Sequence, residues 1–130
     1  MSSNQDNTAL IEQAINAMQN SHCPHSGFRV GAALMSSSGK IYPGTNVEFD
    51  AFSLTVCAER SALFNAVSNG DKKFVKIAIS TNSENFKFPC GLCRQALVEF
   101  SPELEIILVN VKKEQKIVNL RELLPNFFKL

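Results

Sequence analysis

Three cysteines and one glutamate have the residue types and the spacing of a metal site. Cys90 and Cys93 form a Cys-x-x-Cys pair, and Cys57 stands two positions before Glu59. Taken alone, such a pair in a reducing compartment is as compatible with redox chemistry, or with no chemistry, as with metal binding. The third cysteine favours zinc, because three thiolate ligands leave one of four coordination positions to water, as in catalytic zinc sites.

Glu59 is spaced to act on that water without being a ligand. A carboxylate two positions after Cys57, in the first turn of a helix, can take a proton from the water and return it to a substrate. The alternative interpretation is a first-turn glutamate that only complements the helix dipole. Because the cysteines accompany it, we predict that Glu59 is the general acid and base.

Two arginines adjoin the cysteines in the sequence. Zinc with three thiolates has a net charge of −1, which weakens its effect on bound water, so a nearby cation would help. Arg60 follows Glu59, and Arg94 follows Cys93. We expect Arg60 to support the sulfurs, whereas Arg94 fits an ordinary surface arginine equally well.

Hydrophobic spacing predicts the elements that position these residues. Helical spacing predicts helices over residues 8–18, 57–67 and 90–100, and a helical turn over 120–124. Apolar runs predict strands over residues 28–35, 40–46, 75–80, 105–109 and 117–118, the first two joined as a hairpin. Asn7 is expected to cap the first helix. Both cysteine clusters then lie at helix N-termini, where unpaired N–H groups favour thiolates.

The order of these elements and the composition define the class of protein. Strands alternating with helices predict an α/β fold, with right-handed parallel crossovers and helices on the faces of the sheet. The chain has 130 residues and a formal net charge of +1, with no run of Lys or Arg. We therefore expect one domain spanning residues 1–130 and no nucleic-acid partner. The polar N-terminus and the absence of a long apolar run predict a cytoplasmic protein without a membrane partner.

The sequence resembles the cytidine deaminases, the small nucleoside-specific branch of the zinc-dependent deaminases. Cys57-x-Glu59 followed by Pro-Cys-x-x-Cys93 is similar to the three-cysteine form of their signature. The resemblance extends over nearly the whole chain and keeps the order of the family. The matching segments are residues 23–34, 45–48, 55–62, 89–95 and 122–128.

This resemblance implies a three-layer α/β/α fold with a mixed, mostly parallel five-stranded sheet. It also implies hydrolytic deamination of cytidine and deoxycytidine to uridine and deoxyuridine, as in pyrimidine salvage. One zinc ion would be held by Cys57, Cys90 and Cys93, with Arg60 hydrogen-bonded to cysteine sulfur. Glu59 would move a proton from the water to N3 of the pyrimidine before attack at C4 and loss of ammonia.

The substrate-binding residues are implied by the same resemblance. Asn46 and Glu48 would hold the ribose 3′-hydroxyl, and the backbone near Ala58 would help to recognise the base. The ring of Phe28 would pack on the base. Phe128 would complete the pocket from a neighbouring subunit, because the family forms homotetramers with shared active sites. For both phenylalanines, an ordinary core position is the alternative.

One segment departs from the family pattern. Where the family reads Asn-x-Glu-Asn-Ala-x-Tyr, residues 46–52 place Phe49, Asp50 and Phe52 at the last three specified positions. Asp50 adds an acceptor that favours a substrate with a hydroxyl or cationic group there. Blasticidin S deaminases share the zinc motifs and accept a cationic appendage, so a deaminase of that type, or of another modified cytosine nucleoside, is the alternative function. A polynucleotide editor and a non-catalytic zinc module are further alternatives, disfavoured by the near-neutral charge and by Glu59 respectively.

Overall fold

A computed structural model describes residues 3–130, with side chains from residue 7 onward. Its helices are α1 (Ser3–Met18), α2 (Ala58–Ser68), α3 (Gly91–Val98) and α4 (Leu120–Leu123). Its strands are β1 (Val30–Ser36), β2 (Ile41–Thr45), β3 (Phe74–Thr81), β4 (Glu105–Val109) and β5 (Gln115–Asn119). A short 3₁₀ turn, η1 (Phe52–Leu54), lies on the long loop between β2 and α2. Every helix and strand expected from the sequence is therefore present, with ends shifted by a few residues.

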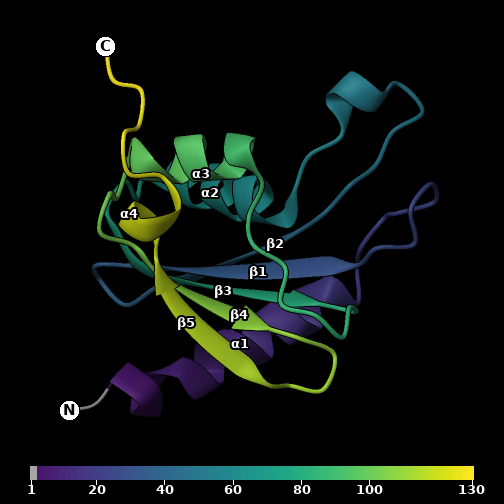
Figure 1. Cartoon of the computed structure of the whole chain (residues 1–130), viewed down its shortest axis with the longest axis horizontal. Helices are drawn as coiled ribbons and strands as arrows, with labels where there is room; N and C mark the ends of the chain where they lie inside the picture. Colours follow the sequence, from purple (N-terminus) through teal and green to yellow (C-terminus); the bar gives the residue numbers. More distant parts are fainter. Residues whose placement is uncertain (1–2) are drawn as a thin grey trace.

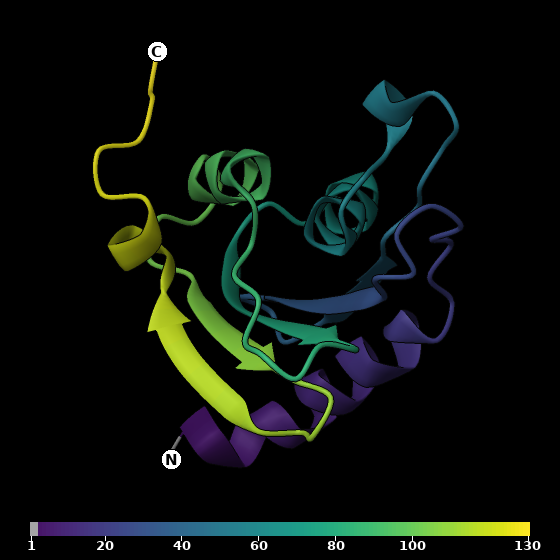
Figure 2. The ribbon, with the colours of Figure 1, turned by 45° about the vertical axis from the view of Figure 1, so that its right-hand side comes forward.

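The strands form one five-stranded sheet in the order β2-β1-β3-β4-β5. Helices α2 and α3 cover one face of the sheet and α1 covers the other, so the molecule has three layers (Figures 1 and 2). The expected three-layer α/β/α arrangement around a mixed sheet is confirmed. None of the described helices is long and apolar enough to cross a membrane.

The expectation of a mostly parallel sheet is wrong. Only β3 and β4 pair in parallel, whereas the pairs β2–β1, β1–β3 and β4–β5 are antiparallel. Two hairpins, β1–β2 and β4–β5, account for the antiparallel pairs. The first hairpin places β1 between β2 and β3, so the connection through α2 joins strands that are not neighbours. The second hairpin adds β5 antiparallel to β4, and α3 alone crosses between adjacent parallel strands.

The first helix begins earlier than its sequence pattern suggests. α1 starts at Ser3, so Asn7 lies inside the helix and does not cap it. The side chain of Asn7 is 2% exposed, and its Oδ1 accepts a hydrogen bond from Lys76 Nζ on β3 at 3.0 Å. The amide thus accepts from a half-buried lysine of the strand on which α1 packs, a tertiary contact that a local capping pattern does not reveal.

Close packing of α2 on the sheet fixes the start of that helix, where Cys57 stands. Gly44 on β2 lies under α2, and a Cβ atom built there would be 2.2 Å from the backbone N of Ala62. It would also be 2.5 Å from the carbonyl O of Ala58. Backbone atoms cannot give way as a flexible side chain does, so only glycine lets the helix approach this closely.

Replacing Gly44 with alanine is therefore expected to destabilise the fold. We expect a loss of about 3 kcal/mol in the free energy of unfolding, because overpacking forces the helix off the sheet. For a chain of this size this corresponds to a fall of roughly 10 °C in Tm, measurable by thermal denaturation followed by circular dichroism. Gly91→Ala is the matched control, because no heavy atom lies within 4 Å of a Cβ there. Equal Tm values for the two variants would contradict the close-packing account.

Candidate active site

The N-termini of α2 and α3 bring three cysteines together. Cys57 is the residue that precedes α2, Cys90 is the residue that precedes α3, and Cys93 lies in the first turn of α3. The backbone N–H of Cys93 donates to Cys90 Sγ at 3.5 Å, so one unpaired N–H of the helix already points at sulfur. The predicted placement of both cysteine clusters at helix N-termini is confirmed.

The sulfur atoms are spaced for a tetrahedral metal ion. Cys57 Sγ lies 3.6 Å from Cys90 Sγ, and Cys90 Sγ lies 3.4 Å from Cys93 Sγ. All three sulfurs are within 4.8 Å of one another, and all belong to free cysteines. Zn–S bonds of about 2.3 Å at tetrahedral angles separate sulfurs by about 3.8 Å, close to these distances. The donor set therefore fits one ion with a coordination position left open.

Electrostatics in the cluster also favour a metal cation. A hydrogen bond from Cys93, followed by those from Arg60 and Cys90, lowers the pKa of Cys57 to about 5. The hydrogen bond between the two thiols, together with burial, raises the pKa of Cys93. One proton is thus held between the pair because adjacent thiolates repel each other. A divalent cation among the sulfurs would neutralise that repulsion and allow all three to ionise.

The two arginines have different surroundings. Arg60 Nη2 donates to Cys57 Sγ at 3.6 Å, and this hydrogen bond raises the pKa of the guanidinium. Arg94 contacts carbonyl oxygens instead, with Nε donating to Pro89 O at 2.8 Å and Nη1 donating to Leu123 O at 3.2 Å. Arg94 is neither a partner of the sulfurs nor a free surface arginine, because it ties α3 to the loop before it and to α4.

Replacing Arg60 with methionine is expected to weaken metal binding. The change removes the donor to Cys57 while keeping an unbranched side chain, and loss of a group that supports a metal ligand lowers affinity by about 10- to 100-fold. Competition for zinc with a coloured chelator measures this affinity. Arg121→Met provides the control, because Arg121 pairs with Glu103 on the exposed surface. An unchanged zinc affinity in Arg60→Met would contradict the supporting role.

Glu59 is buried next to the sulfurs. Its side chain belongs to the first turn of α2 and is 5% exposed. Burial raises the pKa of Glu59 to about 7, and the charge of Cys57 adds to this effect while Arg60 opposes it. A carboxyl group in this environment can exist in both protonation states near neutral pH, as a proton carrier requires.

A cavity of about 210 Å³ opens beside Glu59 and two of the cysteines. Phe28, Asn46 and Glu48 line the same cavity, so it joins most of the residues singled out from the sequence. Sequence analysis missed seven of the residues that line it. These are Val30, Thr55, Val56, Ile79, Thr81, Lys87 and Phe88. The apolar ones are indistinguishable from core residues in the sequence, and Lys87 carries no signal except its place three residues before Cys90.

Asn46 and Glu48, two of the polar residues that line the cavity, are held by hydrogen bonds. Asn46 Oδ1 accepts from the backbone N of Val30 at 3.0 Å, and Asn46 Nδ2 donates to Phe28 O at 2.7 Å. Glu48 accepts from the backbone N–H groups of His25 and Ser26 and from the Ser26 hydroxyl. These bonds, the Ser26 hydroxyl first, lower the pKa of Glu48. Glu48 is therefore ionised at neutral pH, with its carboxylate fixed in orientation.

Two of the expected substrate-binding residues do not line this cavity. Ala58, the first residue of α2, is fully buried, which leaves its backbone as the only group that can contribute. Phe128 is 66% exposed and lines a separate hollow of about 480 Å³ beside the end of α3. Within one chain, Phe128 is thus not brought to Glu59, and its contribution to a neighbouring subunit stays a prediction.

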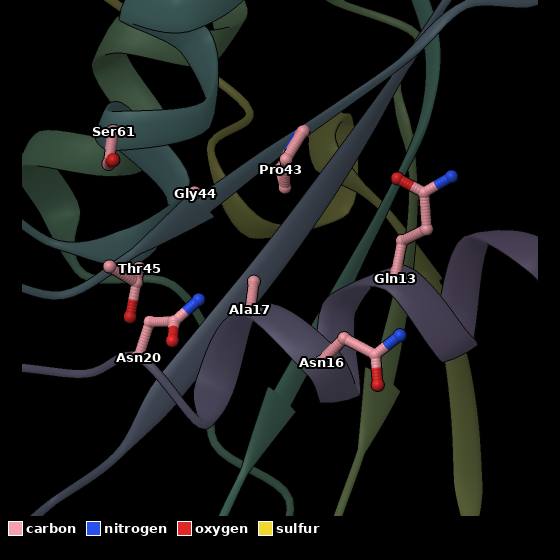
Figure 3. Close-up of a pocket in the computed structure, with 8 residues that line it drawn as sticks. All are labelled: Gln13, Asn16, Ala17, Asn20, Pro43, Gly44, Thr45 and Ser61. Carbon is pink, nitrogen blue, oxygen red and sulfur yellow. The ribbon is translucent and has the colours of Figure 1, made fainter.

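A larger hollow than the Glu59 cavity lies elsewhere and has no reactive group. It has a volume of about 500 Å³ and lies between α1, the edge strand β2 and α2 (Figure 3). Amides and hydroxyls of Asn16, Asn20 and Thr45 surround it, whereas cysteine, histidine and acidic side chains are absent from its lining. Chemistry, and not size, therefore identifies the candidate active site.

Comparisons with known proteins agree with this geometry. Residues 4–109 match the family model for the cytidine and deoxycytidylate deaminase zinc-binding region. The chain is 43% identical over 127 residues to a "Probable cytidine deaminase" of Dictyostelium discoideum, covering 94% of this chain and 86% of the relative. It is 40% identical over 120 residues to a cytidine deaminase of Sporosarcina psychrophila, covering 92% and 88%.

Solved structures show the same fold. The crystal structure of cytidine deaminase from Burkholderia pseudomallei matches with a TM-score of 0.89 and 38% identity, covering 98% of this chain and all of that one. The cytidine deaminase of Mycobacterium tuberculosis matches with a TM-score of 0.83 and 32% identity, covering 96% and 98%. With its cysteine cluster spaced for zinc, the chain belongs to the cytidine and deoxycytidylate deaminase family.

Proposed function

We propose that this protein is a zinc-dependent hydrolase that converts cytidine and deoxycytidine, with water, to uridine or deoxyuridine and ammonia. The observation that carries the proposal is the cavity itself. It places Glu59, Cys57 and Cys90 against a wall that contains Asn46 and Glu48. A proton carrier beside a metal site, facing groups that bind hydroxyls, is the arrangement that hydrolysis of a nucleoside amino group needs.

In the proposed mechanism, Cys57, Cys90 and Cys93 hold the zinc ion. Zinc, when bound, supplies a nucleophile at neutral pH by lowering the pKa of water. Glu59 accepts one proton from the attacking water and delivers it to N3 of the pyrimidine, which makes C4 more electrophilic, and the oxygen of that water adds to C4. Glu59 then carries the second proton of the same water to the amino group, the C4–N bond breaks, and ammonia leaves. The low exposure of Glu59 keeps bulk water from competing for these protons.

The remaining residues of the wall orient the substrate. Glu48 accepts a hydrogen bond from the ribose 3′-hydroxyl, and Asn46 adds a second polar contact to it. The ring of Phe28 packs on the base, and a backbone amide near Ala58 contributes to base recognition. Because Asn46 and Glu48 are already held by the protein, little side-chain freedom is lost when the sugar binds.

We further propose that the protein acts in the cytoplasm as a homotetramer in which Phe128 of one subunit completes the site of another. The cavity of about 210 Å³ is smaller than typical ligand sites of roughly 300–1,000 Å³, which supports completion by a neighbour. Large exposed apolar side chains on the α2–α3 layer, on the long loop and on the C-terminal segment support burial in an assembly. They include Phe52, Leu54, Phe64, Leu92 and Phe128. Four free cysteines fit a reducing compartment.

A substrate panel tests the proposed activity. Zinc-loaded protein is incubated with cytidine, deoxycytidine, cytosine, blasticidin S and a cytosine oligonucleotide, and ammonia release is measured for each. We expect rapid turnover of the two nucleosides and little of the others. Turnover of blasticidin S or of the oligonucleotide ahead of cytidine would replace the proposed substrate while leaving the metal chemistry in place. No ammonia from any of the five would refute the deaminase assignment.

A further inference from the structure

Three residues of the segment 46–52, which departs from the family pattern, contact His25. They are Glu48, Asp50 and Phe52. Glu48 Oε1 accepts from the backbone N of His25 at 2.9 Å, and Asp50 Oδ1 lies 3.1 Å from His25 Nε2. The ring of Phe52 meets the His25 ring edge to face, with centroids 5.2 Å apart and planes at 87°. Residues 48, 50 and 52 thus all face His25, although Asp50 lies in a bend and Phe52 begins η1.

The contacts of His25 affect the position of the Glu48 carboxylate, which is proposed to hold the sugar. The donors to Glu48 are the backbone N–H groups of His25 and Ser26 and the hydroxyl of Ser26. All of them belong to the loop before β1, so the position of that loop sets the orientation of the Glu48 carboxylate. Asp50 and Phe52 hold the same loop through the His25 side chain. At the base of the long loop between β2 and α2, Phe49 N donates to Thr55 Oγ1 at 3.2 Å, and this hydrogen bond joins the two ends of the segment 49–55.

We propose that Asp50 and Phe52 clamp His25 and thereby position Glu48 for the sugar hydroxyl; this inference rests on the proposed nucleoside activity. His25, Asp50 and Phe52 are positioning residues, since they act through Glu48 and not on the reacting atoms. The clamp also gives a common reason for two of the three departures, because both replacement side chains contact the same imidazole. One oxygen of the Asp50 carboxylate, Oδ1, is engaged by His25.

Steady-state kinetics with cytidine and 3′-deoxycytidine test the clamp. In Asp50→Ala, the KM for cytidine should rise about three- to five-fold with kcat nearly unchanged, because the contact between Asp50 and His25 is exposed and its contribution is small. The KM for 3′-deoxycytidine, which lacks the hydroxyl that Glu48 binds, should stay within error. His25→Ala should behave in the same way, and the double variant should not exceed the larger single effect. Asp50→Asn keeps an acceptor for His25 and should stay near wild type.

Glu103→Ala is the matched control, because it removes a different exposed ion pair, with Arg121, and should change neither KM. Equal changes in KM for both substrates in Asp50→Ala, or no change for either, would overturn the clamp. Hydrogen exchange followed by mass spectrometry provides a readout that does not need activity. The amides of residues 22–28 should exchange faster in Asp50→Ala than in wild type, and unchanged exchange would overturn the clamp as well. Absence of cytidine turnover in the wild-type protein would instead refute the proposed function.

Discussion

Glu59→Gln is expected to lower kcat for cytidine by about three to four orders of magnitude while zinc content stays at one ion per chain. Glutamine has nearly the shape of glutamate and keeps a hydrogen-bonding group, but it can neither accept nor release the proton. General acid–base catalysis by one group contributes roughly 10²- to 10⁴-fold, and two proton transfers here depend on the same carboxylate. Ammonia release under saturating cytidine, with metal analysis of the same sample, measures both quantities.

Controls for Glu59→Gln distinguish loss of proton transfer from loss of folding stability. Glu59 is buried, so a stability effect has to be excluded by comparing the Tm of the variant with that of wild type. Glu12→Gln, at an exposed position of α1 on the opposite face of the sheet, is the control for a charge change without a role in the site. Turnover in Glu59→Gln within ten-fold of wild type would show that another group moves the protons.

Cys93→Ser is expected to abolish both zinc binding and activity. Cys93 is fully buried in the first turn of α3. A side chain from the surface therefore cannot reach the metal site to replace the lost thiolate. With only two sulfurs left, zinc content should fall below about a tenth of an ion per chain, since the site loses a ligand of the usual set. Because metal bound only to the folded state stabilises it, Tm should fall as well.

The fourth cysteine supplies a matched control for that experiment. Cys23 lies in the loop before β1 and is not part of the sulfur cluster. Cys23→Ser should therefore retain one zinc per chain and wild-type turnover. A Cys93→Ser variant that still holds a stoichiometric zinc ion would contradict the assignment of the three ligands.

Local patterns were sufficient to predict the elements but not the direction of every strand. Helical spacing identified the segments that became α2 and α3, and Gly70 marked the end of α2 because its φ of +92° suits glycine. The pairing of β1 with β3 depends on which edge of the hairpin faces the rest of the sheet, and sequence periodicity does not encode that choice. Asn7 shows the same limit, since its partner Lys76 is 69 positions away.

The reactive part of the site could be predicted because its chemistry restricts the residue types. Only thiolates, imidazoles and carboxylates bind zinc, so three cysteines near helix starts stand out, and Glu59 stands out beside them. The residues that line the cavity were harder to predict, because Val30 and Ile79 have the same sequence pattern as any buried strand residue. The role of Asp50 could not be predicted, because its partner His25 is brought to it only by the folding of two loops.

Titration of the metal-free protein with zinc tests whether cytidine deamination depends on one zinc ion at the three cysteines. Zinc is removed with a chelator, added back in steps, and the rate of ammonia release from cytidine is measured at each step. We expect the rate to rise in proportion to added zinc and to stop rising at one equivalent per chain, where one ion fills the site of Cys57, Cys90 and Cys93. Full activity in the zinc-free protein, or no ammonia from cytidine at any zinc level, would refute zinc-dependent deamination of cytidine.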